Sequence, residues 1–241
     1  SLASTNADHW ILLAIAYRER LEDVSIFSKG GIATKIRESL EKAIDLDPEN
    51  AEAHYLLAHY SIDAPGMFGG GLDKADEQIT ILKRLDPARA ERALVGKSLH
   101  RHEWEIAESH FLEAIKLDAS PASRFEYGTF LIQRERYEDA AEALAAGMEH
   151  HPEYSENYYL FGLVAVRSRI QVKEGIDAMK RFISMPHSEW REPYSYKWGH
   201  YILGKLYGLA GEKSNEIDQY QQALKLDPDF AQVKKALAEV Q

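Results

Sequence analysis

The 241-residue sequence contains no cysteine, which excludes disulfide bonds and metal sites that depend on thiolate ligands. It also lacks an excess of basic residues, because 29 lysines and arginines stand against 39 aspartates and glutamates, for a formal charge of −10. Nucleic-acid binding needs a basic surface that can neutralise phosphates. The composition therefore indicates a protein with no nucleic-acid partner.

Long apolar segments are missing as well. The longest uninterrupted apolar run covers only residues 10–17, whereas a membrane-spanning helix needs about 20 such residues. We therefore expect no transmembrane segment. A chain without cysteine suits an exported protein and a cytosolic one alike. We expect a bacterial protein, with an exported, periplasmic location favoured over a cytoplasmic one.

What the sequence does contain is a periodic pattern of apolar, small and turn-forming residues. In residues 198–228, Leu203 and Gly204 share one face of a first helix, and Tyr220 and Ala223 share one face of a second helix, which a proline ends. This segment predicts a helical hairpin. Such a hairpin cannot bury its apolar face alone and must stack on neighbours.

The same pattern recurs along the chain. Turn positions at residues 87, 119 and 152 are 32 and 33 residues apart, close to the roughly 34-residue period of stacked helical hairpins. The sequence therefore predicts an all-α solenoid of about six hairpins, followed by a C-terminal helix with Phe230, Val233, Leu237 and Val240 on one face. The predicted hairpins cover residues 6–48, 51–87, 88–119, 120–152, 154–186 and 194–228, and the last helix covers 229–241.

Two of the hairpins are longer than the others. The first carries about ten extra residues around 21–34, with a Gly-Gly pair that predicts a loop between its two helices. The second carries extra residues around 62–72, with three consecutive glycines and an apolar tip at Met67 and Phe68. Two interpretations of this second insert stay open: a packed connector whose Phe68 lies against the scaffold, or a lip over a binding groove.

With these anchors aligned, the chain resembles the tetratricopeptide repeat (TPR) family over nearly its whole length. Small residues recur at matching positions of the first helices and of the second helices: Ala14, Ala58, Gly128, Gly162 and Gly204, and Ala43, Ala114 and Ala223. The resemblance implies a single right-handed superhelical solenoid over residues 1–241. It also implies that the first helices line a concave groove, which holds a peptide or a partner protein.

Motifs for catalysis and for metal binding are missing. Residues 96–98 read Gly-Lys-Ser but lack the leading glycine of a phosphate-binding loop. His100, His102 and His110 crowd one hairpin, yet none of them are three or four residues apart, the spacing that puts two ligands on one helical face. No nucleophile with a nearby base can be nominated. We therefore predict a non-enzymatic protein without a metal or other cofactor.

The positions expected to face the groove are rich in rings and cations. They follow the leading anchor of each first helix by one residue and recur one or two helical turns later. The predicted partner-binding residues are Tyr55, His59, Arg92, His100, Phe125, Gln133, Tyr159, Arg167, Tyr201 and Lys205. Tyrosine and arginine often carry binding energy at interfaces, so we predict a protein or peptide partner. The alternative is that the tyrosines only pack helix against helix.

Two further alternatives stay open. The chain could be a small-molecule-binding or lipid-binding component of an exported bacterial system, with a pocket near the loop at residues 64–71 that carries Met67 and Phe68. The C-terminal helix could cap the exposed end of the stack, or it could form the contact of a homodimer.

Overall fold

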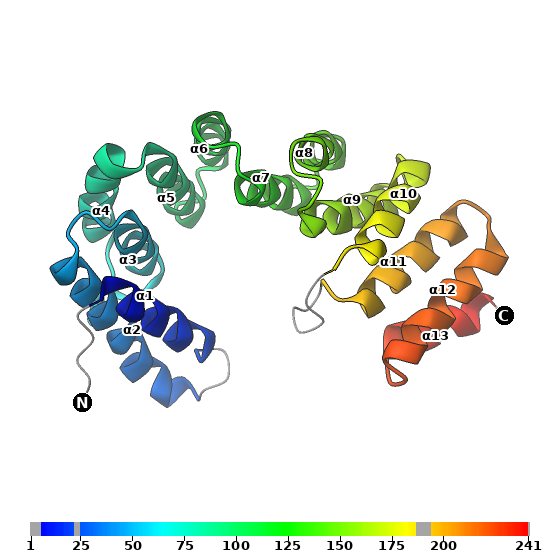
Figure 1. The fold of residues 1–241 in the computed structure, drawn as a ribbon, viewed down its shortest axis with the longest axis horizontal. Coiled ribbons are helices and arrows are strands. Elements are labelled where there is room, and N and C mark those ends of the chain that lie inside the picture. The colour runs from blue at the N-terminus through cyan, green and yellow to red at the C-terminus, as the bar shows by residue number, and fades with distance from the viewer. Residues whose placement is uncertain (1–5, 22–24, 187–193, 241) are drawn as a thin grey trace. The chain divides into compact units, whose positions relative to one another are not determined.

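The computed structural model describes residues 6–21, 25–186 and 194–240. Within these ranges the chain forms thirteen α-helices and one short 3₁₀ helix, with no strand (Figure 1). The predicted all-α helical repeat fold is therefore confirmed. The chain divides into two compact units, residues 1–119 and 120–241, and each contains three helical hairpins. A single right-handed superhelix across both units stays a prediction.

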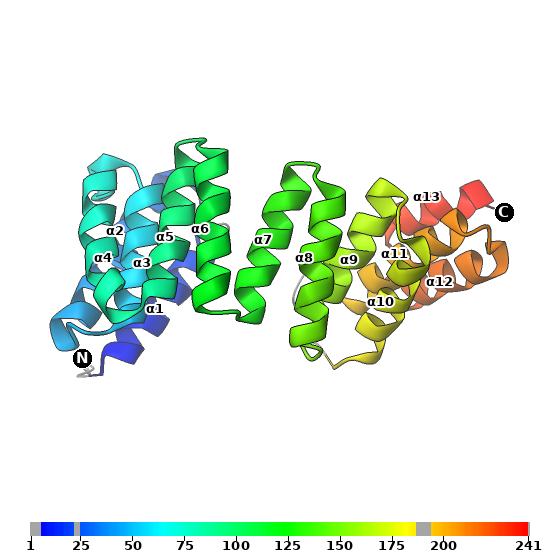
Figure 2. The same cartoon turned by 90° about the horizontal axis from the view of Figure 1, so that it is seen from above.

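The first unit stacks three helix pairs, which Figure 2 shows side by side. They are α1 (Ala7–Glu19) with α2 (Ile26–Leu46), α3 (Ala51–Asp63) with α4 (Leu72–Leu85), and α5 (Pro87–His100) with α6 (Trp104–Leu117). Neighbouring pairs meet where α2 contacts α3 and where α5 contacts both α3 and α4. The 3₁₀ helix η1 (Gly66–Phe68) lies in the connection from α3 to α4 and contacts α2.

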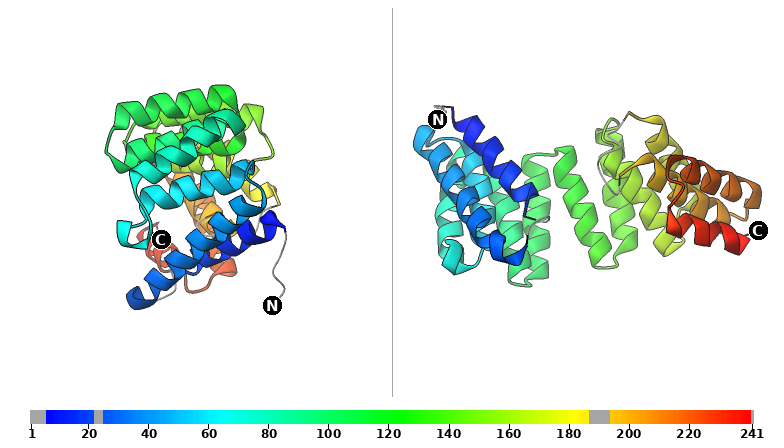
Figure 3. Two further views of the ribbon diagram at one scale, coloured as in Figure 1. Left: turned by 90° about the vertical axis from the view of Figure 1, so that its left-hand side faces the viewer. Right: turned by 90° about the horizontal axis from the view of Figure 1, so that it is seen from below.

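The second unit repeats this arrangement and adds one helix. Its pairs are α7 (Pro121–Gln133) with α8 (Tyr137–His150), α9 (Ser155–Ser168) with α10 (Val172–Ser184), and α11 (Tyr196–Leu209) with α12 (Lys213–Leu226). The last helix, α13 (Ala231–Val240), lies against α12 (Figure 3).

Short polar side chains start several of these helices. The side chain of Asn6 accepts a hydrogen bond from a backbone N–H in the first turn of α1, and Asn50, Asp86 and Ser120 do the same for α3, α5 and α7. Such caps satisfy N–H groups that have no partner inside the helix. Pro87 occupies the first position of α5, where its missing N–H costs nothing.

Small residues let the two helices of a hairpin approach each other closely. A Cβ atom placed on Gly128 of α7 would lie 2.7 Å from Leu144 of α8, and one placed on Gly204 of α11 would lie 2.5 Å from the ring of Tyr220 of α12. Both large side chains are buried. The recurring small residue of the sequence pattern is therefore the position on which a large side chain of the second helix packs.

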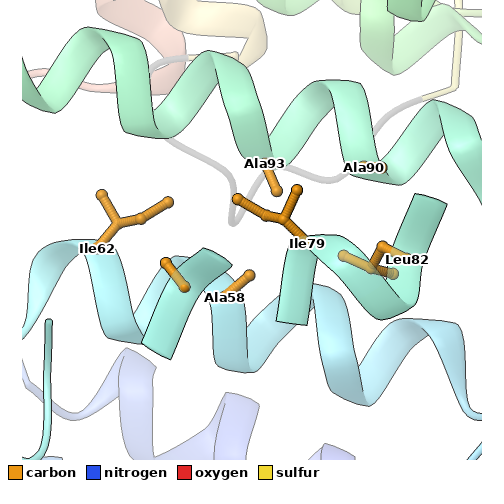
Figure 4. Packing of buried hydrophobic residues seen from close by; sticks show 7 residues of the cluster. Ala58, Ile62, Ile79, Leu82, Ala90 and Ala93 are labelled. Carbon is orange, nitrogen blue, oxygen red and sulfur yellow. The ribbon is translucent and has the colours of Figure 1, made fainter. Parts of the chain in front are cut away.

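The first unit has the same kind of core. Alanines of α3 and α5 surround branched side chains of α4, and in Figure 4 the side chains of Ile79 and Ala93 point toward each other. The buried members of this cluster are Ala58, Ile62, Ala75, Ile79, Leu82, Ala90 and Ala93. Three successive helices therefore share one core, as expected for stacked repeats.

The prediction of a loop around residues 21–34 is wrong for most of this segment. The helix α2 begins at Ile26 and has 21 residues, whereas α4 has 14, so the insert lengthens the helix by about two turns. Gly30 and Gly31 lie inside α2. A Cβ atom on Gly30 would lie 2.6 Å from the ring of Phe68. The glycine therefore makes room for a tertiary contact and does not form a turn; residues 22–24 lie outside the described residues.

The C-terminal helix packs onto the chain itself. Phe230 and Val233 are buried in one cluster with Tyr220 and Ala223 of α12, and Leu237 is partly buried against it. This is the arrangement of a capping helix, which covers the apolar end of a stack. Homodimerisation through α13 stays a prediction.

We predict that Gly204→Ala lowers the free energy of unfolding by about 1–2 kcal/mol. Overpacking a tight contact costs about 1–3 kcal/mol, and the better helix propensity of alanine returns up to about 1 kcal/mol. Denaturant titrations of the wild type and the variant measure the difference. In a Tyr220→Leu background the ring is absent, so Gly204→Ala should lower the free energy of unfolding by less than it does in the wild type. An equal decrease in both backgrounds would show that the Gly204–Tyr220 contact is not the cause.

Candidate functional site

Three of the predicted partner-binding residues meet in the first unit. Tyr55 and His59, one turn apart on α3, have ring centroids 4.5 Å apart in an edge-to-face arrangement. The guanidinium of Arg92, on α5, lies 5.2 Å from the centre of the Tyr55 ring. A cation at this distance is attracted by the face of the ring. All three side chains are partly exposed, so they form an aromatic and cationic surface across two first helices.

A similar pair lies on the second unit. The amino group of Lys205 lies 5.4 Å from the centre of the Tyr201 ring, one turn away on α11. Tyr201 also contacts Trp198 and Phe230, with ring centroids 5.8 and 5.7 Å away. The tyrosine therefore packs on its own unit and keeps part of its surface in solvent.

Tyr159 is a correction to the predicted groove. It is only 4% exposed, because its ring packs 5.3 Å from Phe182 and 4.9 Å from Tyr194 between centroids. For this residue the packing alternative holds, and no partner can reach its side chain. Phe125, also predicted to bind a partner, is partly buried against Tyr154 and Tyr194.

The remaining predicted residues lie near the ends of first helices. His100 and Gln133 are the last residues of α5 and α7, and Arg167 is the last but one of α9. All three are exposed. They are therefore accessible to a partner but belong to different helices.

The structure also shows a cavity of about 520 Å³ in the first unit. It lies between α1, α2, α3 and the segment that follows α3. Most of its wall is apolar, and the charged side chains at its edge, Arg18, Lys29 and Asp63, are exposed. The lining residues are Ala14, Ile15, Arg18, Leu21, Lys29, Ala33, Ile36, Leu40, Tyr55, Leu56, His59, Tyr60, Asp63, Ala64, Pro65 and Phe68.

Both inserts contribute to this cavity. Leu21, Lys29 and Ala33 come from the first insert, and residues 63–65 together with Phe68 come from the second. Sequence reasoning assigned Phe68 to a site but missed the lining residues on α1 and α2. The signal that could have found them is that two consecutive repeats each carry an insert.

The loop at residues 64–71 is tied to the scaffold. The Tyr60 hydroxyl donates a hydrogen bond to the Phe68 carbonyl oxygen at 2.7 Å, and the Lys74 amino group donates to the Gly69 carbonyl oxygen at 2.9 Å. The pKa of the Tyr60 phenol is raised above its ordinary value, because the effect of burial is larger than the opposing effect of the nearby Arg37 charge. The Phe68 ring packs on α2, as the packed-connector interpretation expects, and the same ring lines the cavity. Its neighbour Met67 is 83% exposed.

Two negative findings apply to the described residues. No three or more histidine, aspartate or glutamate side chains in these ranges are grouped so that they could hold a metal ion. Nor is any helix in the same ranges both long enough and apolar enough to cross a membrane.

Stacked helical hairpins define the protein as an α-helical repeat protein, and comparison with solved structures shows which repeat fold it has. It resembles YrrB, described as a TPR protein with an unusual peptide-binding site, at 17% identity and a TM-score of 0.57, over 83% of this chain and 98% of YrrB. It also resembles PilF of Pseudomonas aeruginosa at 18% identity and a TM-score of 0.60, over 97% of each chain.

A third neighbour is PilW, described as a widely conserved type IV pilus biogenesis factor, at 13% identity and a TM-score of 0.62, over 96% of this chain and 98% of PilW. No protein-family model and no curated protein sequence matches the chain. The chain therefore has the TPR fold, as the sequence predicted.

The adjacent glycines of α2 give a matched test of the contact with Phe68. Alanine favours a helix over glycine by up to about 1 kcal/mol at either position. A Cβ atom on Gly31 meets nothing within 4 Å, whereas one on Gly30 would overlap the Phe68 ring. We expect Gly31→Ala to have a higher free energy of unfolding than the wild type. Gly30→Ala should have a lower free energy of unfolding than Gly31→Ala. Denaturant titration measures both, and equal effects would contradict the contact.

The Tyr60 phenol predicts a pH dependence. Because its pKa is raised in the folded chain, a tyrosine in the unfolded chain loses its proton first, above about pH 10. The folded state then binds more protons, so stability falls as the pH rises. Above pH 10 the wild type should therefore lose stability more steeply than Tyr60→Phe, as measured by denaturant titrations at several pH values. Parallel curves would contradict this assignment.

Proposed function

We propose that the chain is a non-enzymatic interaction protein whose first helices bind a polypeptide partner. The observation that supports this most directly is the pairing of a partly exposed tyrosine with a cation in both units, Tyr55 with Arg92 and Tyr201 with Lys205. A fold shared with YrrB, a protein described as having a peptide-binding site, agrees with the proposal.

The chemistry of these pairs indicates what the partner offers. The ring of each tyrosine gives apolar contact area, and the adjacent cation can hold a carboxylate. The exposed residues His100 and Arg167 add an imidazole and a guanidinium group near the ends of first helices. The partner is therefore expected to present an acidic group beside an apolar or aromatic side chain.

Selection from a displayed library of random peptides tests the proposal. Enriched peptides are synthesised, and their affinity for the full chain is measured by calorimetry. We expect acidic, apolar peptides, and we expect Arg92→Gln or Lys205→Gln to weaken their binding by about tenfold or more, as hot-spot residues do. Lys83→Gln and Lys225→Gln, exposed lysines on second helices, should leave it unchanged.

Two outcomes would overturn the proposal: no peptide is enriched, or the enriched peptides bind both groove variants as tightly as the wild type. The bacterial origin, the periplasmic location and the homodimer stay predictions.

A second candidate function is the binding of a small molecule or lipid next to residues 64–71. The observation that favours it is the cavity of about 520 Å³, whose wall includes residues 63–65 and Phe68.

A further inference from the structure

We infer that the cavity between α1, α2 and α3 binds a single-chain amphiphile with a carboxylate head group. The inference rests on the second candidate function and adds the chemical class of the ligand. Tyr55 and His59 of the proposed polypeptide surface also line the cavity, but Arg92 and Lys205 do not. The variants at Arg92 and Lys205 therefore test polypeptide binding separately from the cavity.

The size and chemistry of the wall favour an alkyl chain. A volume of about 520 Å³ lies within the range of about 300–1,000 Å³ that is typical of small-molecule sites. It is larger than a single side chain, so a peptide would have to bring backbone amide groups with it. Those groups need hydrogen-bond partners. The inner wall offers mainly apolar groups, and the Tyr60 hydroxyl already donates to the Phe68 carbonyl.

The charge at the edge favours an anionic head group. Arg18, near the end of α1, and Lys29, near the start of α2, are both exposed residues that line the cavity. Asp63 is the single acidic residue among the lining residues. A carboxylate between the Arg18 and Lys29 side chains would form charge-assisted hydrogen bonds. The alkyl chain of the ligand would then extend over Ala33 and Ile36.

The site is built from several independent features of the chain. Extra residues in two consecutive repeats converge on one cavity. The Phe68 ring is held against α2 at a glycine, and its carbonyl oxygen is held by Tyr60. Gly70 lets the loop return to α4, because a Cβ atom there would overlap the Ala64 carbonyl oxygen. These contacts fix the side of the cavity that the loop forms.

A chain-length series tests the alkyl part. Calorimetry of the full chain with octanoate, decanoate, dodecanoate and tetradecanoate, each below its micelle concentration, should show one site. The affinity should rise by about three- to fourfold per added methylene, until the chain fills the cavity. The absence of binding at about 1 mM dodecanoate would overturn the inference, since an amphiphile site should reach at least this affinity.

A head-group comparison tests the carboxylate. Arg18→Gln and Lys29→Gln should each weaken dodecanoate binding severalfold and leave dodecanol binding unchanged. Both residues are exposed, so the variants should fold. If dodecanol binds as tightly as dodecanoate, or if neither variant weakens dodecanoate binding, the assignment of an anionic head group is wrong and the inference fails.

A blocking variant tests the location. Ala33 lines the cavity and is partly buried, whereas Ala16, on α1, is exposed and does not line it. Ala33→Trp should reduce dodecanoate affinity by about tenfold or more by filling the cavity, and Ala16→Trp should not. Circular dichroism checks that both fold, and if Ala33→Trp does not, Ala33→Leu replaces it. A folded, blocked variant that binds like the wild type would overturn the location. A negative result in any of these amphiphile experiments would leave the test of peptide binding with Lys205→Gln unaffected.

Discussion

Close packing within each helical hairpin is the constraint on which the rest of the structure depends. The first helix carries a small residue where the second helix inserts a large side chain, as Gly128 and Gly204 do for Leu144 and Tyr220. This contact lets the two helices of a hairpin lie close together, and apolar faces remain on the sides that the hairpin turns toward its neighbours. Those faces then bury each other as the hairpins stack. The repeated pattern of small and large residues is thus the direct cause of the fold.

The first hairpin departs from this scheme, and a cavity lies between it, α3 and the segment that follows α3. Its helices differ in length, since α1 has 13 residues and α2 has 21. The start of α2 therefore extends past the end of α1. The Phe68 loop of the next hairpin covers part of this surface. The cavity lies between this loop and the helices α1, α2 and α3, with Ala14 and Leu40 of the hairpin core in its wall.

The sequence was sufficient to predict the hairpins and the small anchor residues, because these depend on local spacing and on neighbouring residues. It was not sufficient where distant contacts decide. Gly30 lies in a helix and faces Phe68, a contact with another repeat that local spacing does not reveal. Tyr159 is buried because Phe182 and Tyr194 come from elsewhere in the second unit. The cavity likewise combines four segments of the chain, and the sequence pointed only to Tyr55, His59 and Phe68 among its lining residues.

Xenon titration followed by methyl NMR tests the central claim, that an apolar cavity lies between α1, α2, α3 and the Phe68 loop. Apolar cavities bind xenon. Methyl signals of Ile36 and Leu40, which line the cavity, should shift and saturate, while those of Leu144 and Val164, in the closely packed second unit, should not. Shifts of equal size at all four residues, or no saturable shift at Ile36 and Leu40, would contradict the account.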